Sequence, residues 1–302
     1  MSTVLPRRRR AKLAPYLLIS AAIAILLLGM GYPLVWQIVT SFQEFGLAQQ
    51  FGKPAAFVGF DNYAALAADP QFWLVTARSL AFCIIGAGVT VVVGTAFAVL
   101  MTRIPKGVRL TLQISLLLAW AMPIVAAMTV WIWLFDRRRG VVNYVLGALG
   151  IDMNRYDWLS NPWTFFLVAG IIVVWMSVPF VAFSVYAGLT QVSDEVIEAA
   201  QLDGANGWQR FRLITAPLIR PVLSIVLLLN LIWDLRVFTH FTMLQDAGGK
   251  TSDFDVLGTY IYKIGAGAGD FGASAAVSIF ILAITIALSW FYVRSMLKEE
   301  RS

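Results

Sequence analysis

The chain is poor in charged residues. Asp, Glu, Lys and Arg make up 13% of its 302 residues, whereas hydrophobic residues make up 59% and the mean hydropathy is +0.76. Soluble domains carry about a quarter of their residues as charged side chains, because these cover the surface. The deficit excludes an ordinary soluble domain and indicates that most of the surface faces lipid.

Cysteine and histidine each occur once, as Cys83 and His240. A lone cysteine excludes an intrachain disulfide, so cysteine usage says nothing about the redox compartment. With one histidine, the sequence offers neither a histidine-based metal cluster nor a histidine-based catalytic triad.

Acidic residues are also outnumbered by basic ones. The net charge is +6 and the isoelectric point is near 9.6. The basic residues lie in the gaps between apolar runs, where a membrane protein places its cytoplasmic anchors. They are not interleaved with aromatic residues in a solvated segment, as on a nucleic-acid surface. This placement argues against nucleic acid as a partner and in favour of membrane lipid.

The N-terminus carries a basic segment, residues 1–12, before the first apolar run. Four consecutive arginines, Arg7 to Arg10, and Lys12 precede a run that begins at Leu13 and continues past Ser41 without charge. A signal peptide has an apolar region of about 7–15 residues followed by a small-residue cleavage site. The longer run without such a site predicts a retained first transmembrane helix, residues 13–36, with its basic end in the cytoplasm.

Six apolar stretches are long enough to cross a membrane, which takes about 20 residues. Lipid offers no hydrogen-bond partners to the backbone, so such runs form helices, and the alternating pattern of a barrel is absent. The sequence therefore predicts an all-α polytopic membrane protein with six transmembrane helices. They are Leu13–Trp36, Ser79–Met101, Leu110–Phe135, Trp163–Leu189, Pro221–Met243 and Phe271–Val293.

Lysine and arginine predict the orientation. With the N-terminus inside, 14 of the 23 basic residues lie in inner segments, 8 in outer segments and Arg236 within a span. The bias places both termini in the cytoplasm. It makes residues 37–78 an outer loop with a short helix near Asp61–Ala68, and residues 79–297 a core with five further spans. Arg137-Arg138-Arg139 falls on the outer side against the rule, which a long loop, a re-entrant segment or a miscounted span would explain.

The long inner loop, residues 191–217, has the clearest local pattern. Ser193 followed by two acidic residues is typical of a helix N-terminus, and Gly204 is typical of a helix end. A second short helix follows, which Pro217 and Pro221 redirect into the membrane. A short amphipathic helix held at the cytoplasmic surface is suited to docking into a groove of a partner protein.

The same loop resembles the EAA loop of ABC importer permeases. Glu198-Ala199-Ala200, Gly204, Ile214 and Pro217 have the spacing of that motif, with Ala216 where the family usually has Leu. The neighbouring residues are similar to the sugar-permease branch, of the maltose and glycerol-phosphate type. Trp233 to Thr239 with Gly248 is similar to the fifth span of disaccharide and amino-sugar permeases of the diacetylchitobiose type.

The resemblance implies a fold, a function and partners. The fold would be that of a type I ABC importer permease, and the chain would form half of a sugar channel in the bacterial inner (plasma) membrane. Its partners would be a second, homologous permease, two copies of a cytoplasmic ATPase that hold ATP and Mg²⁺, an extracytoplasmic sugar-binding lipoprotein and a di- or oligosaccharide. The chain itself would bind no cofactor. The residues that would couple to the ATPase are Glu198, Ala199, Ala200, Asp203, Gly204, Ile214 and Pro217.

Four polar residues interrupt the fifth span: Asn230, Asp234, Arg236 and His240. A charged side chain inside a membrane costs about 2.5–3.5 kcal/mol on insertion scales and is usually functional or paired. Helical spacing predicts one face with Asn230 and Asp234 and another with Arg236 and His240. The four could line the translocation path or form a structural network between packed helices.

Two other functions are open to a chain of this kind. A membrane-embedded transferase would need convergent catalytic residues, but the acids Asp61, Asp152 and Asp157 show no metal or acid–base spacing. An ion-coupled carrier would use Asp234 and Arg236 and would need no ATPase. The end of a phosphate-binding loop, Gly-Lys-Thr, occurs at residues 249–251, but Leu244 stands where the first glycine is required. It is expected to be a turn, so the chain would have no nucleotide site of its own.

Overall fold

A computed structural model describes residues 10–153, 155–248 and 252–299. The arginines at positions 7–9, the expected turn at residues 249–251 and Arg301 lie outside the described residues. The chain divides into two compact units, the first formed by residues 1–69 and 261–280 and the second by residues 70–260 and 281–302.

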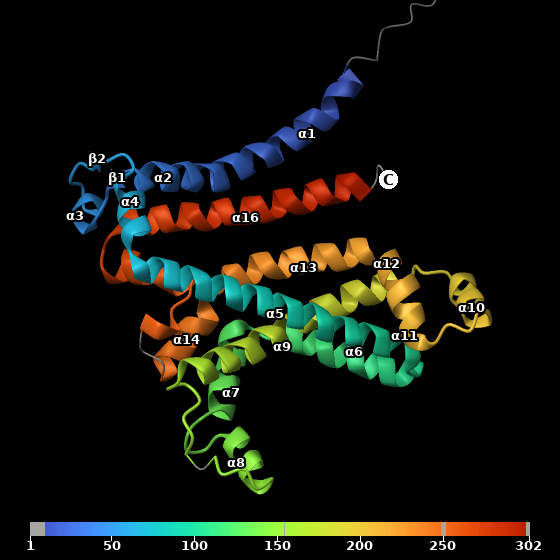
Figure 1. Cartoon of the computed structure of the whole chain (residues 1–302). Helices are drawn as coiled ribbons and strands as arrows, with labels where there is room; N and C mark the ends of the chain where they lie inside the picture. Colours follow the sequence, from blue (N-terminus) through green and yellow to red (C-terminus); the bar gives the residue numbers. More distant parts are fainter. Residues whose placement is uncertain (1–9, 154, 249–251, 300–302) are drawn as a thin grey trace, which may run out of the picture. The chain divides into compact units, whose positions relative to one another are not determined.

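Most of the described chain is helical, as the sequence predicts (Figure 1). In chain order the elements are α1 (Arg10–Leu26), η1 (Leu27–Gly31), α2 (Tyr32–Ser41), β1 (Gln43–Glu44), α3 (Leu47–Gln50), β2 (Ala56–Phe57), α4 (Asp61–Ala68), α5 (Pro70–Arg103), α6 (Lys106–Ala121), α7 (Ile124–Leu134), α8 (Val141–Ala148), α9 (Pro162–Leu189), α10 (Asp194–Leu202), α11 (Gly207–Arg210), η2 (Phe211–Thr215), α12 (Ala216–Leu218), α13 (Arg220–Leu235), α14 (Thr239–Ala247), η3 (Ser252–Phe254), α15 (Leu257–Tyr262), η4 (Lys263–Gly267) and α16 (Phe271–Glu299).

The first unit begins with the apolar helix formed by α1, η1 and α2. Its membrane-compatible part is Ile19–Ser41, so it reaches five residues beyond the predicted end at Trp36. The helix continues because Thr40 and Ser41 are buried, and the Ser41 hydroxyl donates to the Ile38 carbonyl at 2.7 Å. The antiparallel hairpin β1–β2 follows, and α4 has the bounds Asp61–Ala68 that the sequence predicts.

Main-chain hydrogen bonds connect this hairpin to the start of α16 within the first unit. The Phe271 and Gly272 amides donate to the Phe45 carbonyl at 2.9 and 3.0 Å, and Gly46 pairs with Asp270 in an isolated bridge. A Cβ at Gly272 would collide with the Gln43 carbonyl. The hairpin and the helix therefore form one rigid frame.

In the second unit, α5 packs against α9 and α13. Helix α5 begins at Pro70, nine residues before the predicted Ser79, because Phe72, Val75 and Thr76 are buried although charged Arg78 interrupts the apolar run. Close packing with α9 requires Gly94, since a Cβ there would lie 2.6 Å from the Val181 side chain.

Two of the six predicted spans are broken helices. The predicted span Leu110–Phe135 consists of α6 and α7, which meet at 101°. Pro123 explains the break, because proline lacks an amide hydrogen and pushes Met122 out of the helical region. The predicted span Pro221–Met243 is divided, because α13 ends at Leu235 and α14 begins at Thr239. Residues 207–218 and 220–235 form a second bent pair, at 75°, whose bend lies just before that span. Four helices are long and apolar enough to cross a membrane, or up to six if each bent pair is one span.

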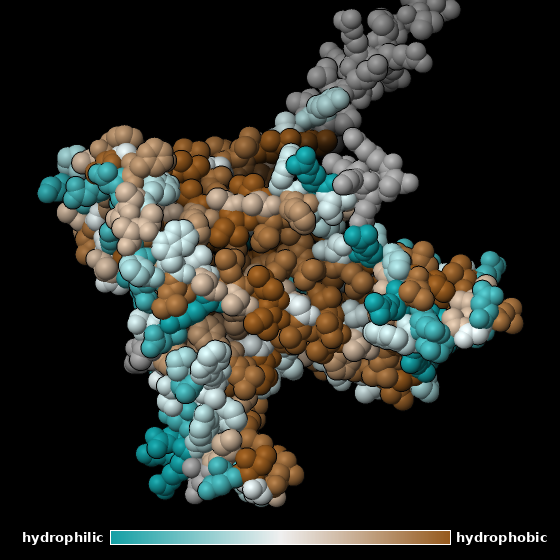
Figure 2. Space-filling model, viewed as in Figure 1, coloured by the Kyte–Doolittle hydropathy of each residue, from teal (hydrophilic) through white to brown (hydrophobic). Residues whose placement is uncertain are grey.

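The buried core of the second unit is rich in aromatic residues. Phe165 and Phe241 are fully buried and lie against Phe82 and Phe254. Outside this core, hydrophobic residues dominate the surface over α5 and α6, whereas hydrophilic residues gather over α10 and around α8 (Figure 2). This distribution is that of a protein whose helices meet lipid along their length and water at their ends.

Candidate functional site

Helix α10, within the predicted coupling loop, begins where the sequence predicts. The Ser193 hydroxyl accepts a hydrogen bond from the Val196 amide at 3.4 Å, and Asp194 and Glu195 occupy the first turn. The hydroxyl satisfies a free amide of the first turn, and the two acidic side chains interact favourably with the positive end of the helix dipole. Local signals therefore define where the helix begins.

The end of α10 is a Schellman motif centred on Gly204. The Gly204 amide donates to the Gln201 carbonyl and the Ala205 amide donates to the Ala200 carbonyl, each at 3.0 Å. Gly204 has φ +80°, a left-handed conformation that costs other residues about 1–2 kcal/mol. No neighbouring atom lies within 4 Å of a Cβ placed at position 204, so crowding does not explain the glycine of the predicted motif. The φ angle of the backbone does.

Helix α11 starts at a capping box. The Asn206 side chain accepts from the Trp208 and Gln209 amides at 3.1 and 2.9 Å, and the Gln209 side chain accepts from the Asn206 amide at 2.8 Å. A π-helical turn, η2, and the short α12 follow, and they contain Ile214 and Pro217. The chain then bends by 75° into α13.

The loop is anchored at its base. Ile219, at the bend, is 2% exposed and packs in a cluster with Ala98, Val185 and Val226. The Gly207 backbone lies beside the end of α5, where a Cβ would be 3.8 Å from the Arg103 guanidinium. A movement of the loop would therefore reach α5 and α13 directly.

The loop carries large apolar side chains that remain exposed in the described part of the chain. Leu202 is 90% exposed, Leu213 69% and Trp208 66%. Exposed apolar residues of this size, next to exposed acidic Glu198 and Asp203, are typical of a protein interface. Of the seven predicted coupling residues, Ala200 is buried, Ile214 is half-buried and the other five are exposed.

Asn230 and Asp234 lie one turn apart on α13 and are both buried, with 0% and 4% exposure. The Asn230 side-chain amide donates to the Val226 carbonyl at 2.7 Å, while its Oδ1 and Asp234 Oδ2 have no hydrogen-bond partner. Asp234 Oδ2 faces the backbone of Gly86 on α5, and the Cys83 thiol donates to the Leu231 carbonyl at 3.1 Å. The predicted shared face exists, and it is turned toward α5.

Arg236 and His240 do not share a face, because the helix that would place them together ends at Leu235. Arg236 is exposed at the helix C-cap, with φ −102° and ψ 11°. His240 belongs to the separate helix α14, where its Nε2 lies 3.2 Å from Met176 Sδ on α9. The four predicted polar residues are thus one buried pair and two separate side chains.

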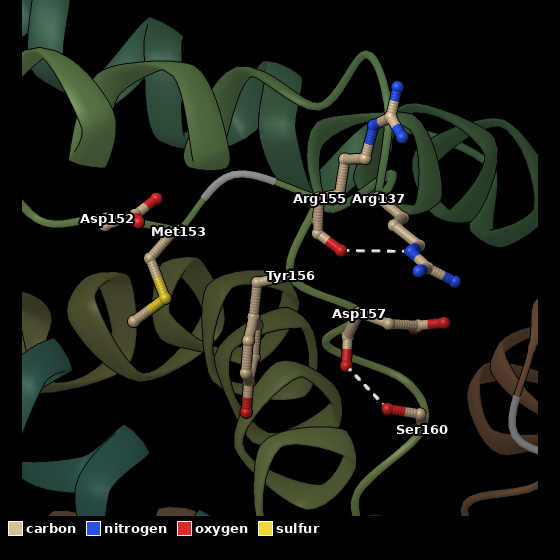
Figure 3. A pocket seen from close by; sticks show the side chains of 7 residues that line it. All are labelled: Arg137, Asp152, Met153, Arg155, Tyr156, Asp157 and Ser160. Atoms are coloured by element: carbon tan, nitrogen blue, oxygen red, sulfur yellow. Dashed lines mark hydrogen bonds between the residues drawn. The ribbon is translucent and has the colours of Figure 1, made fainter.

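The segment with the three consecutive arginines forms a compact lobe around α8. Arg137 Nε donates to the Arg155 carbonyl at 3.0 Å, and Arg137 and Arg155 line a cavity of about 470 Å³ together with Asp152 and Asp157 (Figure 3). The Asp136 carboxylate accepts from the Arg139 and Arg138 amides at 2.7 and 2.9 Å, and these bonds hold the pKa of Asp136 below its ordinary value.

Residues 90–295 match the family model described as the inner membrane component of binding-protein-dependent transport systems. The chain belongs to this family. It is 40% identical over 293 residues to the diacetylchitobiose uptake system permease protein DasB of Streptomyces coelicolor, covering 97% of this chain and 89% of that protein. The trehalose/maltose transport system permease protein MalF of Thermococcus litoralis is 29% identical, with 95% and 94% covered.

Solved structures give the same fold for this permease. A chain of the bacterial alginate ABC transporter, in complex with an alginate pentasaccharide-bound periplasmic protein, superposes with a TM-score of 0.80 at 22% identity. The match covers 94% of this chain and 93% of that one. The ABC importer permease fold and the inner-membrane location predicted from the sequence are confirmed.

Sequence analysis of the permease missed the α5 side of the buried pair. Helices α5 and α13 run in opposite directions (Figure 1), so Thr90, one turn after Gly86, comes level with Asn230. Thr90 is fully buried and its hydroxyl has no partner. The signal available in the sequence was the small and polar series Cys83, Gly86 and Thr90 within an apolar run.

Proposed function

We propose that this permease is one of two homologous channel-forming subunits of an ATP-driven importer of di- or oligosaccharides. The observation that carries the proposal is the exposed, doubly capped α10 on a member of this permease family. The two relatives named above support the substrate class, because their names refer to diacetylchitobiose and to trehalose and maltose.

In this proposal the cytoplasmic partner is an ATPase present in two copies, which holds ATP and Mg²⁺. Helix α10 docks in a groove of that ATPase through Glu198, Ala199, Asp203 and the apolar side chain of Leu202. Ala200, Gly204, Ile214 and Pro217 set the position of the helix. Closure of the ATPases moves the loop, and the bend at Ile219 passes the movement to α13.

The proposed orientation has both termini in the cytoplasm and residues 37–78 outside. A sugar-binding lipoprotein delivers its ligand to the outer loops, and the channel then opens inward. Arg236, which is exposed, is the polar residue of the fifth span that we assign to the translocation path. We assign Asn230 and Asp234 to the packing of α13 on α5, and His240 to the packing of α14 on α9.

Copurification and uptake test the proposal together. The chain, extracted in mild detergent, is expected to bring down a second permease, an ATPase and a lipoprotein. Proteoliposomes of that complex with the binding protein are expected to accumulate sugar only with ATP inside. Accumulation that persists without the ATPase and collapses with a protonophore would instead identify an ion-coupled carrier.

A single carboxylate tests the role of α10. Glu198→Ala is expected to lower uptake and sugar-stimulated ATP hydrolysis at least tenfold, because it removes an exposed charge from the docking face. Glu44→Ala is the matched control, since Glu44 is an equally exposed acid on the β1–β2 hairpin. Equal activity of the two variants would contradict the assignment of α10 to the ATPase interface.

A further inference from the structure

A cavity of about 800 Å³ opens in the first unit, lined by residues of α2, the β1–β2 hairpin with α3, and the start of α16. We propose that this cavity is a binding subsite for a neutral di- or oligosaccharide, formed by glutamine amides and aromatic rings. The inference rests on the proposed function, and it adds a sugar site in a part of the chain separate from α13. Ligand sites usually occupy about 300–1,000 Å³, which includes this volume.

The polar lining consists of uncharged amides. Gln37, Gln43, Gln49 and Gln50 all line the cavity, four of the ten glutamines in the chain. Gln49 Oε1 accepts from the Gly46 amide at 3.0 Å. No other glutamine side chain of this group has a hydrogen bond within the described part of the chain. Each amide offers both donors and an acceptor, as sugar hydroxyl groups require.

The charge of the lining excludes several ligand classes. Lys53 is the one ionisable side chain among the thirteen lining residues. A divalent cation would need carboxylates, and a phosphate or polyanion would need several basic groups. An uncharged, hydroxyl-rich molecule matches this lining best.

Three aromatic rings supply the apolar part of the cavity. The rings of Trp36 and Phe45 meet edge to face at 6.2 Å, and Phe45 meets Phe271 in the same way at 6.3 Å. Trp36 remains 53% exposed. The C–H faces of sugar rings pack on aromatic faces, while their hydroxyl groups need the polar neighbours described above. A tryptophan that only anchored the helix in lipid would not share its surroundings with these amides.

Thr40 provides an independent indication of a missing partner. It lines the cavity, is 5% exposed, and its hydroxyl oxygen has no hydrogen-bond partner. A buried hydroxyl without a partner is rare in folded proteins and costs about 1–3 kcal/mol. The oxygen is closed off from solvent, so a ligand hydroxyl in the cavity would satisfy it after a rotation of the Thr40 side chain.

The frame around the cavity is preorganised. The amides of Phe271 and Gly272 bond to the Phe45 carbonyl, and a side chain at position 272 would collide with the hairpin. The aromatic and amide groups are thus held on two segments that are fixed to each other. A rigid site loses little entropy on binding, which favours affinity for a ligand that fits the site.

The test measures sugar binding to the purified full transporter without its binding protein. Diacetylchitobiose, maltose and trehalose are each titrated, and binding is followed by saturation-transfer NMR. At least one sugar is expected to bind. Trp36→Leu and Thr40→Val are each expected to weaken its Kd by about tenfold, the effect of losing one good contact. Trp163→Leu, which removes a tryptophan that is 86% exposed and does not line the cavity, is expected to leave the Kd unchanged.

The outcomes separate the subsite from the proposed function. Absence of binding for all three sugars, or equal binding by wild type and Trp36→Leu, would overturn the subsite even if ATP-driven uptake is intact. Binding that depends on Trp36 while wild-type proteoliposomes show no ATP-driven uptake would leave the subsite standing and reject the importer. A photoreactive group can also be placed at position 50. Cross-linking of this group to the binding protein, with no cross-link to added sugar, would overturn the subsite.

Discussion

Gly86 on α5 lies against the Asp234 carboxylate on α13, so closely that a Cβ at position 86 would be 3.0 Å from Asp234 Oδ2. The two residues are separated by about half of the permease sequence and join two helices of its second unit. Gly86 therefore allows α5 and α13 to approach closely, and Asp234 is part of the contact between these two helices.

Gly86→Ala is therefore expected to lower the free energy of unfolding by about 1–3 kcal/mol through overpacking, and to lower uptake with it. Thermal unfolding of the detergent-solubilised complex measures the effect. Gly88→Ala is the matched control, because a Cβ there has no atom within 4 Å. Equal destabilisation by both changes would show that the α5–α13 contact is not the cause.

Asp234→Asn is expected to raise the free energy of unfolding by about 1 kcal/mol, because it replaces a buried carboxylate, whose Oδ2 has no hydrogen-bond partner among the described residues, by a neutral group of the same shape. Uptake per folded transporter is expected to remain near that of wild type, since the side chain faces α5. Thermal unfolding and proteoliposome uptake are measured on the same preparation. A loss of uptake with increased stability would place Asp234 on the translocation path.

Gly204 offers a test of backbone geometry in the coupling loop. Gly204→Ala is expected to cost about 1–2 kcal/mol in the end of α10, because φ +80° is strained for alanine. Sugar-stimulated ATP hydrolysis is expected to fall. Gly204→Asn should recover most of the loss, since asparagine tolerates this conformation. If both variants lose activity equally, the glycine is needed for close approach of the partner and not for its φ angle.

The orientation of the chain can be measured with a membrane-impermeant maleimide. Arg138→Cys is expected to react from the outside of intact cells and Gln201→Cys only after the membrane is opened. Cys83 is 2% exposed and serves as an internal unreactive thiol. Reaction of Arg138→Cys from the inside only would show that the arginine-rich lobe obeys the positive-inside rule and that the spans are miscounted.

Asp136 should make the arginine-rich lobe sensitive to acid. Its pKa is lowered by the amides of Arg139 and Arg138, so its stabilising effect is present above the ordinary Asp pKa of about 4 and is lost as the pH falls through the lowered value. Hydrogen exchange of these two amides is expected to be slower in wild type than in Asp136→Ala, with a difference that disappears on acidification. A difference that is independent of pH would exclude the charge as its cause.

Local signals predicted the coupling loop well. Ser193 and Gly204 bound α10 because each acts on the backbone within a few residues. The end of α13 at Leu235 was not predictable in this way, since the apolar run continues through Val237 and Phe238. What the sequence could not reveal was packing between distant segments, such as Gly86 against Asp234.

The cavity of the first unit was invisible for the same reason. Its glutamines belong to a segment that reads as an outer loop with polar residues. Its remaining wall comes from Phe271 and Ser274, more than two hundred residues later in the chain. Only the hairpin and its main-chain bonds to the start of α16 bring these groups around one space.

The π-helical turn at Phe211–Thr215 affects the direction in which the side chains of the predicted coupling loop point relative to α13. A π turn contains one residue more than an α turn, and each residue of an α-helix advances the side chains by about 100°. Deleting one residue from this turn would leave both helix caps intact and yet swing Leu202 and Trp208 to another side of α13. The direction in which α10 presents its proposed docking face therefore depends on the number of residues between Gly204 and Pro217. A homologous loop with matching residues but a different count would present that face at a different angle.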